Sequence, residues 1–138
     1  MAPDSGHPTL PMMLRDRASQ ALGMTVIAGE PGHAVVSMSV RDDMLNGFNI
    51  THGGLVFALA DTAFAIACND GDQITVAAAA EITFLRSTGL GDELTATAEV
   101  RARSGRSGVY DVRVVDSAGN VVAEFRGHSR RTGTAIPA

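Results

Sequence analysis

The feature that most constrains the fold is a long apolar segment between residues 52 and 69. From Leu55 to Cys68 the single charged side chain is Asp61. A surface helix of a globular protein carries a polar face, and this segment has none. It therefore predicts a central helix over residues 52–69 that is buried on most sides. Its many alanines allow other backbone segments to pack closely against it.

Elsewhere the chain is dominated by apolar residues at every second position, a pattern that predicts β-strands. These strands are expected at residues 24–28, 34–40, 74–86, 94–103, 110–115 and 121–131. Helical spacing predicts one further helix over residues 10–22, with Gly23 as its stop. The expected fold class is α+β, with a curved antiparallel β-sheet wrapped around one long central α-helix, plus a short N-terminal helix.

The chain has 138 residues, a length that suits one domain. We expect residues 1–9 to form a flexible arm, residues 10–133 the domain, and residues 134–138 a tail. Residues 1–11 hold three prolines and no apolar run, which is unlike a signal peptide or a membrane span. We therefore expect a cytoplasmic protein without a membrane partner.

Charge and cysteine content exclude several classes of function. The net charge is −4, and all 11 basic residues are arginines, so a general nucleic-acid-binding surface is not expected. The single cysteine, Cys68, cannot form an internal disulfide, and no histidine cluster accompanies it, as a metal site would require. The sequence thus predicts no metal, no cofactor and no nucleic-acid partner.

Asp61 is the residue that needs an explanation. A carboxylate in apolar surroundings is costly unless it is paired, and no basic residue lies three or four positions away on the helix. One interpretation is a structural aspartate that binds distant backbone groups or faces a wet interface. The other is a catalytic carboxylate whose pKa is raised by burial.

The start of the same helix predicts a second part of an active site. His52, Gly53 and Gly54 lie where the first backbone N–H groups have no partner within the helix. Glycines let a ligand approach this backbone, and the helix dipole adds partial positive charge. A developing oxyanion would be stabilised there.

Spacing then limits how these two parts can act together. Gly53 and Asp61 are eight residues apart, which is about 12 Å along a helix. A carbonyl bound at the N–H of Gly53 cannot also reach Asp61 of the same helix. If both serve one reaction, Asp61 must come from a second subunit, and a two-fold homodimer would then contain two equivalent sites at its interface.

Arginines gather late in the sequence, around the turn at residues 103–108 and in the last predicted strand. They are interpreted either as solvated strand faces or as a seat for the phosphates of a nucleotide-bearing substrate.

At these residues the sequence resembles the hotdog-fold acyl-CoA thioesterases, and within them the phenylacetate-degradation (PaaI) type. The resemblance covers roughly residues 12–133. It is carried by Met-Leu-Asn-Gly at 44–47, His-Gly-Gly at 52–54 and Leu-Ala-Asp-Thr-Ala-Phe-Ala at 59–65, with shorter matches at 84–86, 91–92, 108–111 and 125–127. It implies hydrolysis of an acyl-CoA thioester without metal, by homodimers that pair into homotetramers.

The resemblance also implies roles for individual residues. Asp61 is the catalytic carboxylate acting across the dimer interface, and the N–H of Gly53 polarises the thioester carbonyl. Asn46 holds the carbonyl or the water, and His52 lines the same site. The substrate-binding residues are Phe84 at the substrate channel and a CoA seat made of Arg103, Ser104, Gly105, Arg106, Ser107 and Arg131.

One departure from the family pattern concerns the attacking water. Related enzymes often carry a serine in the strand that faces the carboxylate, whereas this chain has Val76 followed by four alanines. Thr62 or Thr75 is the candidate replacement. We further expect an apolar acyl pocket made by residues 44–48 with the rings of Phe57 and Phe64.

The leading hypothesis is an acyl-CoA thioesterase of aromatic (phenylacetate) catabolism, acting on phenylacetyl-CoA or a hydroxylated or other aryl-acyl-CoA. Two alternatives remain open at this point. One is a hydratase or dehydratase on the same fold, with His52 as a proton-transfer group. The other is an acyl-CoA-binding module without enzymatic activity.

Overall fold

The computed structural model of the chain describes residues 10–137. In chain order its elements are α1 (Leu10–Arg15), α2 (Arg17–Ala21), β1 (Thr25–Glu30), β2 (His33–Ser39), the 3-10 helix η1 (Asp42–Met44), α3 (Gly53–Cys68), β3 (Gln73–Phe84), β4 (Glu93–Ser104), β5 (Ser107–Val115) and β6 (Val121–Ala135). The arm expected at residues 1–9 lies outside the described residues.

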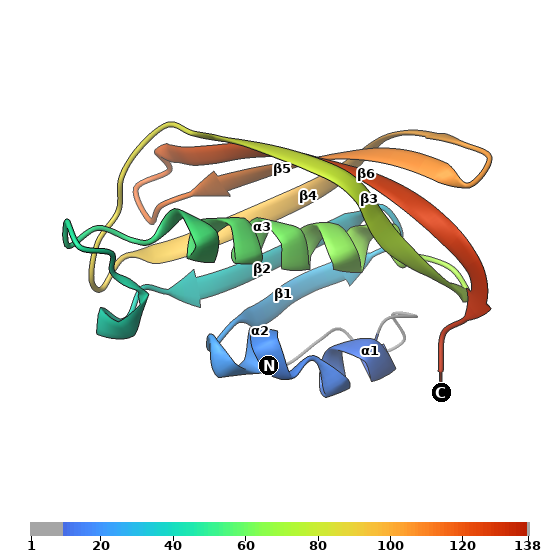
Figure 1. Cartoon of the computed structure of the whole chain (residues 1–138), viewed down its shortest axis with the longest axis horizontal. Coiled ribbons are helices and arrows are strands. Elements are labelled where there is room, and N and C mark those ends of the chain that lie inside the picture. The colour runs from blue at the N-terminus through green and yellow to red at the C-terminus, as the bar shows by residue number, and fades with distance from the viewer. Residues whose placement is uncertain (1–9, 138) are drawn as a thin grey trace.

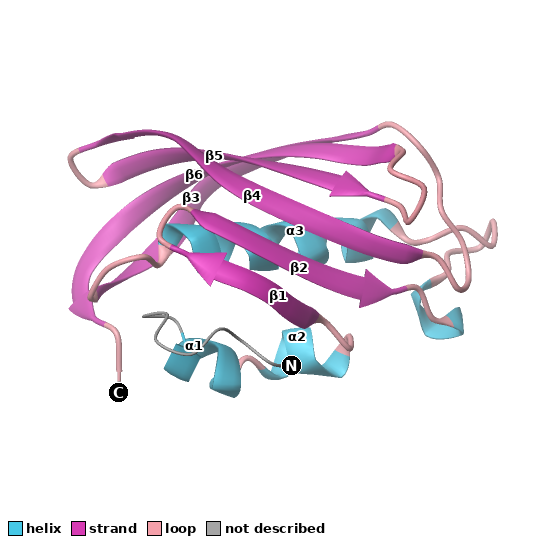
Figure 2. Cartoon of the chain, turned by 180° about the vertical axis from the view of Figure 1, so that it is seen from behind, coloured by secondary structure: helices cyan, strands magenta, loops and turns pink. Residues whose placement is uncertain are grey.

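One antiparallel sheet contains all six strands, in the order β1-β2-β4-β5-β6-β3. The sheet curves around α3, which lies along its concave side (Figure 1), and the view from behind shows the strands crossing over the helix (Figure 2). The predicted α+β architecture of a curved sheet around one central helix is therefore confirmed.

The core lies between α3 and the sheet. Every second residue is buried along β5 and along the first half of β4, as the period-two pattern predicts. Phe64 from the middle of α3 is 1% exposed and packs against Tyr110 and Phe125, with ring centroids 5.5 and 5.9 Å away. A Cβ atom built at Gly127 would lie 2.7 Å from the Phe64 ring, so only glycine fits beneath it.

This packing overturns the expected acyl pocket. Phe64 is enclosed in the core, and Phe57 packs edge-on against Phe125 with the ring centroids 5.3 Å apart. The Phe64 ring therefore fills the interior, and the partly buried Phe57 ring packs against the core beside it. The sequence could not distinguish these cases, because an aromatic ring on an apolar helix fits either role.

Several predicted boundaries were wrong, and two of them have a clear physical cause. The first helix is divided at Asp16, because its carboxylate caps α2 by accepting hydrogen bonds from the backbone N–H and the hydroxyl of Ser19. The last strand continues to Ala135 because it pairs with the whole length of β3, up to Gln73. It therefore runs two residues past the expected end of the domain.

One face of α3 is not covered by the sheet. Gly54, Ala58, Asp61 and Ala65 follow one another at helical spacing along this face, and each is at least partly exposed. Beside it, β3 is hydrogen-bonded to β6 on one side and has no strand partner on the other among residues 10–137. No helix among residues 10–137 is long and apolar enough to cross a bilayer.

Candidate active site

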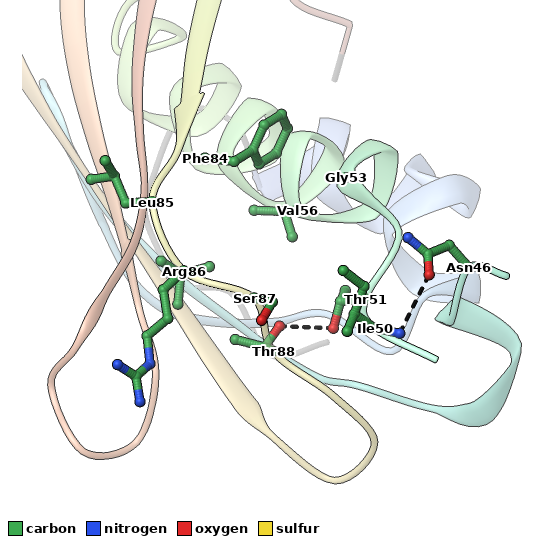
Figure 3. Close-up of a pocket in the computed structure, with 11 residues that line it drawn as sticks. Asn46, Ile50, Thr51, Gly53, Val56, Phe84, Leu85, Arg86, Ser87 and Thr88 are labelled. Carbon is green, nitrogen blue, oxygen red and sulfur yellow. Dashed lines mark hydrogen bonds between the residues drawn. The ribbon is translucent and has the colours of Figure 1, made fainter. Parts of the chain in front are cut away.

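A cavity of about 350 Å³ lies at the N-terminal end of α3 (Figure 3). It is formed where the loop before α3, the first turn of α3 and the segment that follows β3 come together. Its lining residues are Asn46, Ile50, Thr51, Gly53, Val56, Phe84, Leu85, Arg86, Ser87, Thr88 and Val122. Three of the residues predicted for the site, namely Asn46, Gly53 and Phe84, are therefore brought together here.

The first turn of α3 presents one free donor to this cavity. His52 is the N-cap, and its Nδ1 accepts the N–H of Gly54 at 2.9 Å. The N–H of Gly53 has no acceptor among the described residues. This group carries the partial positive charge of the helix N-terminus and is available to a carbonyl oxygen.

Packing gives a further reason for the two glycines. A Cβ atom at Gly53 would lie 3.1 Å from Cζ of Phe84, and one at Gly54 would lie 3.1 Å from Nδ1 of His52. The absent side chains thus make room for the Phe84 ring and for the capping imidazole. His52 is not among the residues that line this cavity, and its ring is turned toward the helix start, where Nδ1 caps Gly54.

Asn46 stabilises the loop before α3 and also faces the cavity. Its Oδ1 accepts the N–H groups of Phe48 and Ile50 at 2.8 and 3.4 Å. Its amide nitrogen makes no hydrogen bond within residues 10–137, and it points toward the start of α3 (Figure 3). Two unpartnered donors, this amide and the N–H of Gly53, therefore border one cavity.

Sequence reasoning missed the opposite wall of the cavity. The hydroxyls of Thr51 and Thr88 are 2.7 Å apart, and the N–H of Thr51 donates to the carbonyl of Thr88 at 2.9 Å. Both threonines are buried. They join two loops that are 37 residues apart in the sequence, and no local pattern signals such a contact.

Asp61 lies outside this cavity, on the uncovered face of α3. Its carboxylate has no hydrogen bond or ion pair among the described residues. Burial, and secondarily the negative charge of Asp16, raise the pKa of Asp61 above its ordinary value. The carboxylate is thus isolated, as the sequence predicted, and α3 is unbroken between it and Gly53.

The two threonines considered as replacements for the family's serine are both engaged elsewhere. The hydroxyl of Thr62 is 3.0 Å from that of Ser19, and both side chains are buried. The hydroxyl of Thr75 donates to the carbonyl of Gln73 at 3.4 Å.

A second, much smaller cavity of about 20 Å³ lies at the other end of α3, next to Cys68. Five of the six residues expected in the CoA seat line it, namely Arg103, Gly105, Arg106, Ser107 and Arg131, whereas Ser104 does not. Arg103 forms an ion pair with the nearly buried carboxylate of Asp70, and its Nε donates to the Tyr110 hydroxyl. Arg106 and Arg131 have no carboxylate partner among residues 10–137. Of the three arginines beside this cavity, these two therefore have charges that are available to an anion.

Cys68 is buried beside this second cavity. Burial, followed by the charge of Asp70, raises the pKa of its thiol to about 12. The thiol is therefore protonated near neutral pH and is a poor nucleophile.

Comparison with known proteins agrees with this geometry. Residues 48–123 match the model of the Thioesterase superfamily. The chain is 48% identical over 125 residues to the Escherichia coli (strain K12) acyl-coenzyme A thioesterase PaaI, which covers 91% of this chain and 89% of the relative. The chain belongs to the thioesterase superfamily. The solved structure of E. coli PaaI, from the phenylacetic acid degradation operon, matches with a TM-score of 0.91 and 46% identity, over 94% of both chains.

A more distant structural match has been solved with a ligand. It is a Streptococcus mutans protein bound to acetyl-CoA, which matches with a TM-score of 0.78 and 26% identity, over 82% of this chain and 91% of that one. Together these findings confirm the hotdog fold, the resemblance to the PaaI-type thioesterases and the predicted enzyme class, acyl-CoA thioesterase.

Proposed function

We propose that this thioesterase hydrolyses phenylacetyl-CoA, or a hydroxylated or related aryl-acyl-CoA, to the free acid and CoA. The observation that carries the proposal is the pair of unpartnered donors at the start of α3, the N–H of Gly53 and the amide of Asn46. Such donors stabilise the negative charge that develops on a thioester oxygen during attack. The similarity to PaaI of E. coli supports the substrate class.

A homodimer is part of the proposal, since one chain holds the donors and the carboxylate too far apart. The free edge of β3 supports it. Val76 is 45% exposed, the alanines at 77–80 are also exposed, and this edge has no strand partner among residues 10–137. Long apolar edges of this kind are normally covered by another strand. Two copies related by a two-fold axis would pair along β3, and pairing of such dimers would give the homotetramer that the family implies.

The reaction would then proceed in three steps. The thioester carbonyl binds to the N–H of Gly53 and the amide of Asn46. Asp61 of the second copy either removes a proton from the attacking water or attacks the carbonyl itself, and the C–S bond breaks to release the CoA thiolate. Attack by water gives the free acid directly, whereas attack by Asp61 gives an acyl-Asp61 anhydride that water then cleaves to the free acid and the regenerated carboxylate. Single turnover in heavy-oxygen water separates these routes, because only cleavage of the anhydride at the Asp61 carbonyl transfers label into that carboxylate. A cytoplasmic location suits a CoA ester substrate.

An apolar groove next to Asp61 supports the position of the acyl group. Its volume is about 420 Å³, and Ala65, one turn beyond Asp61 on the same face of α3, forms part of its wall. The other lining residues are Met12, Arg15, Asp16, Asn69, Ile74, Ile136 and Pro137. An aryl-acetyl group would fill this groove while its carbonyl stays beside Asp61.

The proposed CoA seat gives one prediction. Replacing Arg106 and Arg131 together by glutamine is expected to raise KM for phenylacetyl-CoA about tenfold with little change in kcat, because phosphate contacts contribute equally to ground state and transition state. Hydrolysis of phenylacetyl-pantetheine, which lacks the nucleotide, should not change. Arg113→Gln is the matched control, since Arg113 already pairs with Glu124 at 2.7 Å. An equal loss on both substrates would contradict the assignment.

The oxyanion donor gives a second prediction. Gly53→Pro removes the N–H while suiting the first position of α3, where proline is favoured and where the ψ of 130° at His52 is compatible with a following proline. Because one donor is lost, kcat is expected to fall by about 100-fold or more.

Gly53→Ala is the control for this change. It adds a comparable side-chain carbon near the Phe84 ring but keeps the N–H. Thiol release by this variant should stay within about tenfold of the wild type, since Phe84 is 53% exposed and can move. If alanine and proline cost the same, crowding and not the lost donor explains the effect.

The activity itself is tested by thiol release from phenylacetyl-CoA, with crotonyl-CoA assayed for hydration in parallel. We expect hydrolysis without hydration, because Nδ1 of His52 is occupied as a helix cap and the ring lies outside the cavity. Hydration without CoA release would favour the hydratase. Tight binding without turnover would favour the binding module.

A further inference from the structure

A short chain of hydrogen bonds, from Asp16 through Ser19 to Thr62, connects the N-terminal helices to α3. The hydroxyl of Ser19 donates to Oδ2 of Asp16 at 2.6 Å, and its oxygen is 3.0 Å from the hydroxyl of Thr62. Because the only proton of Ser19 is given to the carboxylate, Thr62 must be the donor in the second bond. Ser19 is 3% exposed and Thr62 is 9% exposed, so this contact is shielded from water.

This chain of bonds fixes a second carboxylate next to Asp61. Thr62 follows Asp61 directly on α3, and Asp16 is held from both sides, since the N–H of Ser19 also donates to its Oδ1 at 2.9 Å. Burial raises the pKa of Asp61 above its ordinary value, and the negative charge of Asp16 raises it further. In the described part of the chain, Asp16 is the one charged residue with this effect. Asp16 and Ala65 line the same groove, and Asp61 lies one turn before Ala65 on the same face of α3, so both carboxylates lie on this side of the helix.

The cationic neighbours of Asp16 in the sequence are Arg15 and Arg17, and neither is among the causes of the raised pKa of Asp61. Arg15 donates to the carbonyl of Pro137 at 3.2 Å and keeps its positive charge. Cys68, further along α3, keeps its proton, and burial raises the pKa of Tyr110 on β5 above its ordinary value. At the C-terminal end of α3, Arg103 and Asp70 form an ion pair with each other.

We propose that Asp16 is a positioning residue whose fixed charge, added to the burial of Asp61, moves the pH range in which the enzyme works to higher pH. The proposal rests on the catalytic role proposed above for Asp61. Because two nearby carboxylates repel each other when both are ionised, Asp61 retains its proton to higher pH. A carboxylate that ionises closer to the working pH is a more effective base.

Asp16→Asn tests this proposal, because asparagine caps a helix as well as aspartate does but carries no charge. We expect the acid limb of the pH dependence of kcat/KM to move to lower pH by about half a unit or more. The carboxyl carbon NMR titration of Asp61, identified by its absence in Asp61→Asn, should move in the same direction by a similar amount. Asp42→Asn, which removes an exposed carboxylate in η1, is the control and should move neither.

Two results would count against the proposal in different ways. An unmoved NMR titration of Asp61 in Asp16→Asn would overturn it, whatever the activity. A moved titration with an unmoved acid limb would uphold the coupling but overturn the role of Asp61 in the reaction. If Asp16 acted only as part of the wall of the apolar groove next to Asp61, Asp16→Asn would change KM at every pH without moving the acid limb of the pH dependence. If Asp16→Asn does not fold, Asp16→Ser replaces it, since serine also caps and is uncharged.

Discussion

Asp61→Asn is expected to lower kcat/KM for phenylacetyl-CoA by about a thousandfold or more, measured as thiol release. Asparagine has nearly the same shape but can neither accept the proton of water nor attack a carbonyl, so the chemical step loses its base or nucleophile. Substrate binding should be largely retained, because the amide fills the same space on the uncovered face of α3. The control is Asp42→Asn, an exposed aspartate in η1 that should retain full activity.

The same substitution is not expected to destabilise the protein. The pKa of Asp61 is raised in the folded state, so the native protein binds this proton more tightly than the unfolded chain does. Ionisation of Asp61 therefore lowers stability as the pH rises through its folded-state pKa, and the neutral amide removes that cost. Thermal unfolding at neutral pH should give a Tm equal to or above that of the wild type. A large fall in Tm would attribute the lost activity to misfolding, and wild-type turnover would refute the catalytic role.

Subunit complementation is expected to restore activity from two inactive variants. Gly53→Pro lacks the donor and Asp61→Asn lacks the carboxylate, so homodimers of either are impaired at both sites. When the two chains are co-expressed in equal amounts and pair at random, half of the dimers are mixed, and each mixed dimer has one intact site and one doubly defective site. The mixture should therefore recover about one quarter of wild-type activity.

This result distinguishes an interface site from a site within one chain. If Gly53 and Asp61 of the same chain acted together, every mixed dimer would contain one defect at each site and no activity would return. A Gly53→Pro, Asp61→Asn double variant co-expressed with either single variant is the control, since no pairing then creates an intact site. Activity no higher than the sum of the two homodimers would contradict the proposed interface.

Much of the fold followed from local pattern. The apolar run around Asp61 predicted α3 to within one residue at each end, and alternation located the strands of the sheet. These features depend on which face of an element is buried. Apolar residues mark that face at every second position of a strand and at every third or fourth position of a helix. The break in the first helix did not follow, because Asp16 fits both a helix interior and a cap, and the choice depends on the contact between Ser19 and Thr62.

The candidate site also has features that the sequence predicts and features that it does not. The sequence by itself determined an isolated carboxylate on a buried helix, a glycine pair at the start of that helix, and a separation between them too long for one chain, because these depend only on residue type and helical rise. Only the tertiary structure decided that His52 is a cap, that Arg103 is neutralised by Asp70, that Phe64 belongs to the core, and that Asp16 lies beside Asp61. The His52 cap is a local contact with Gly54, which its residue type alone did not reveal. The other three depend on contacts between segments distant in the sequence, and such contacts are fixed by the packing of the sheet around α3 and leave no periodic signal in the chain.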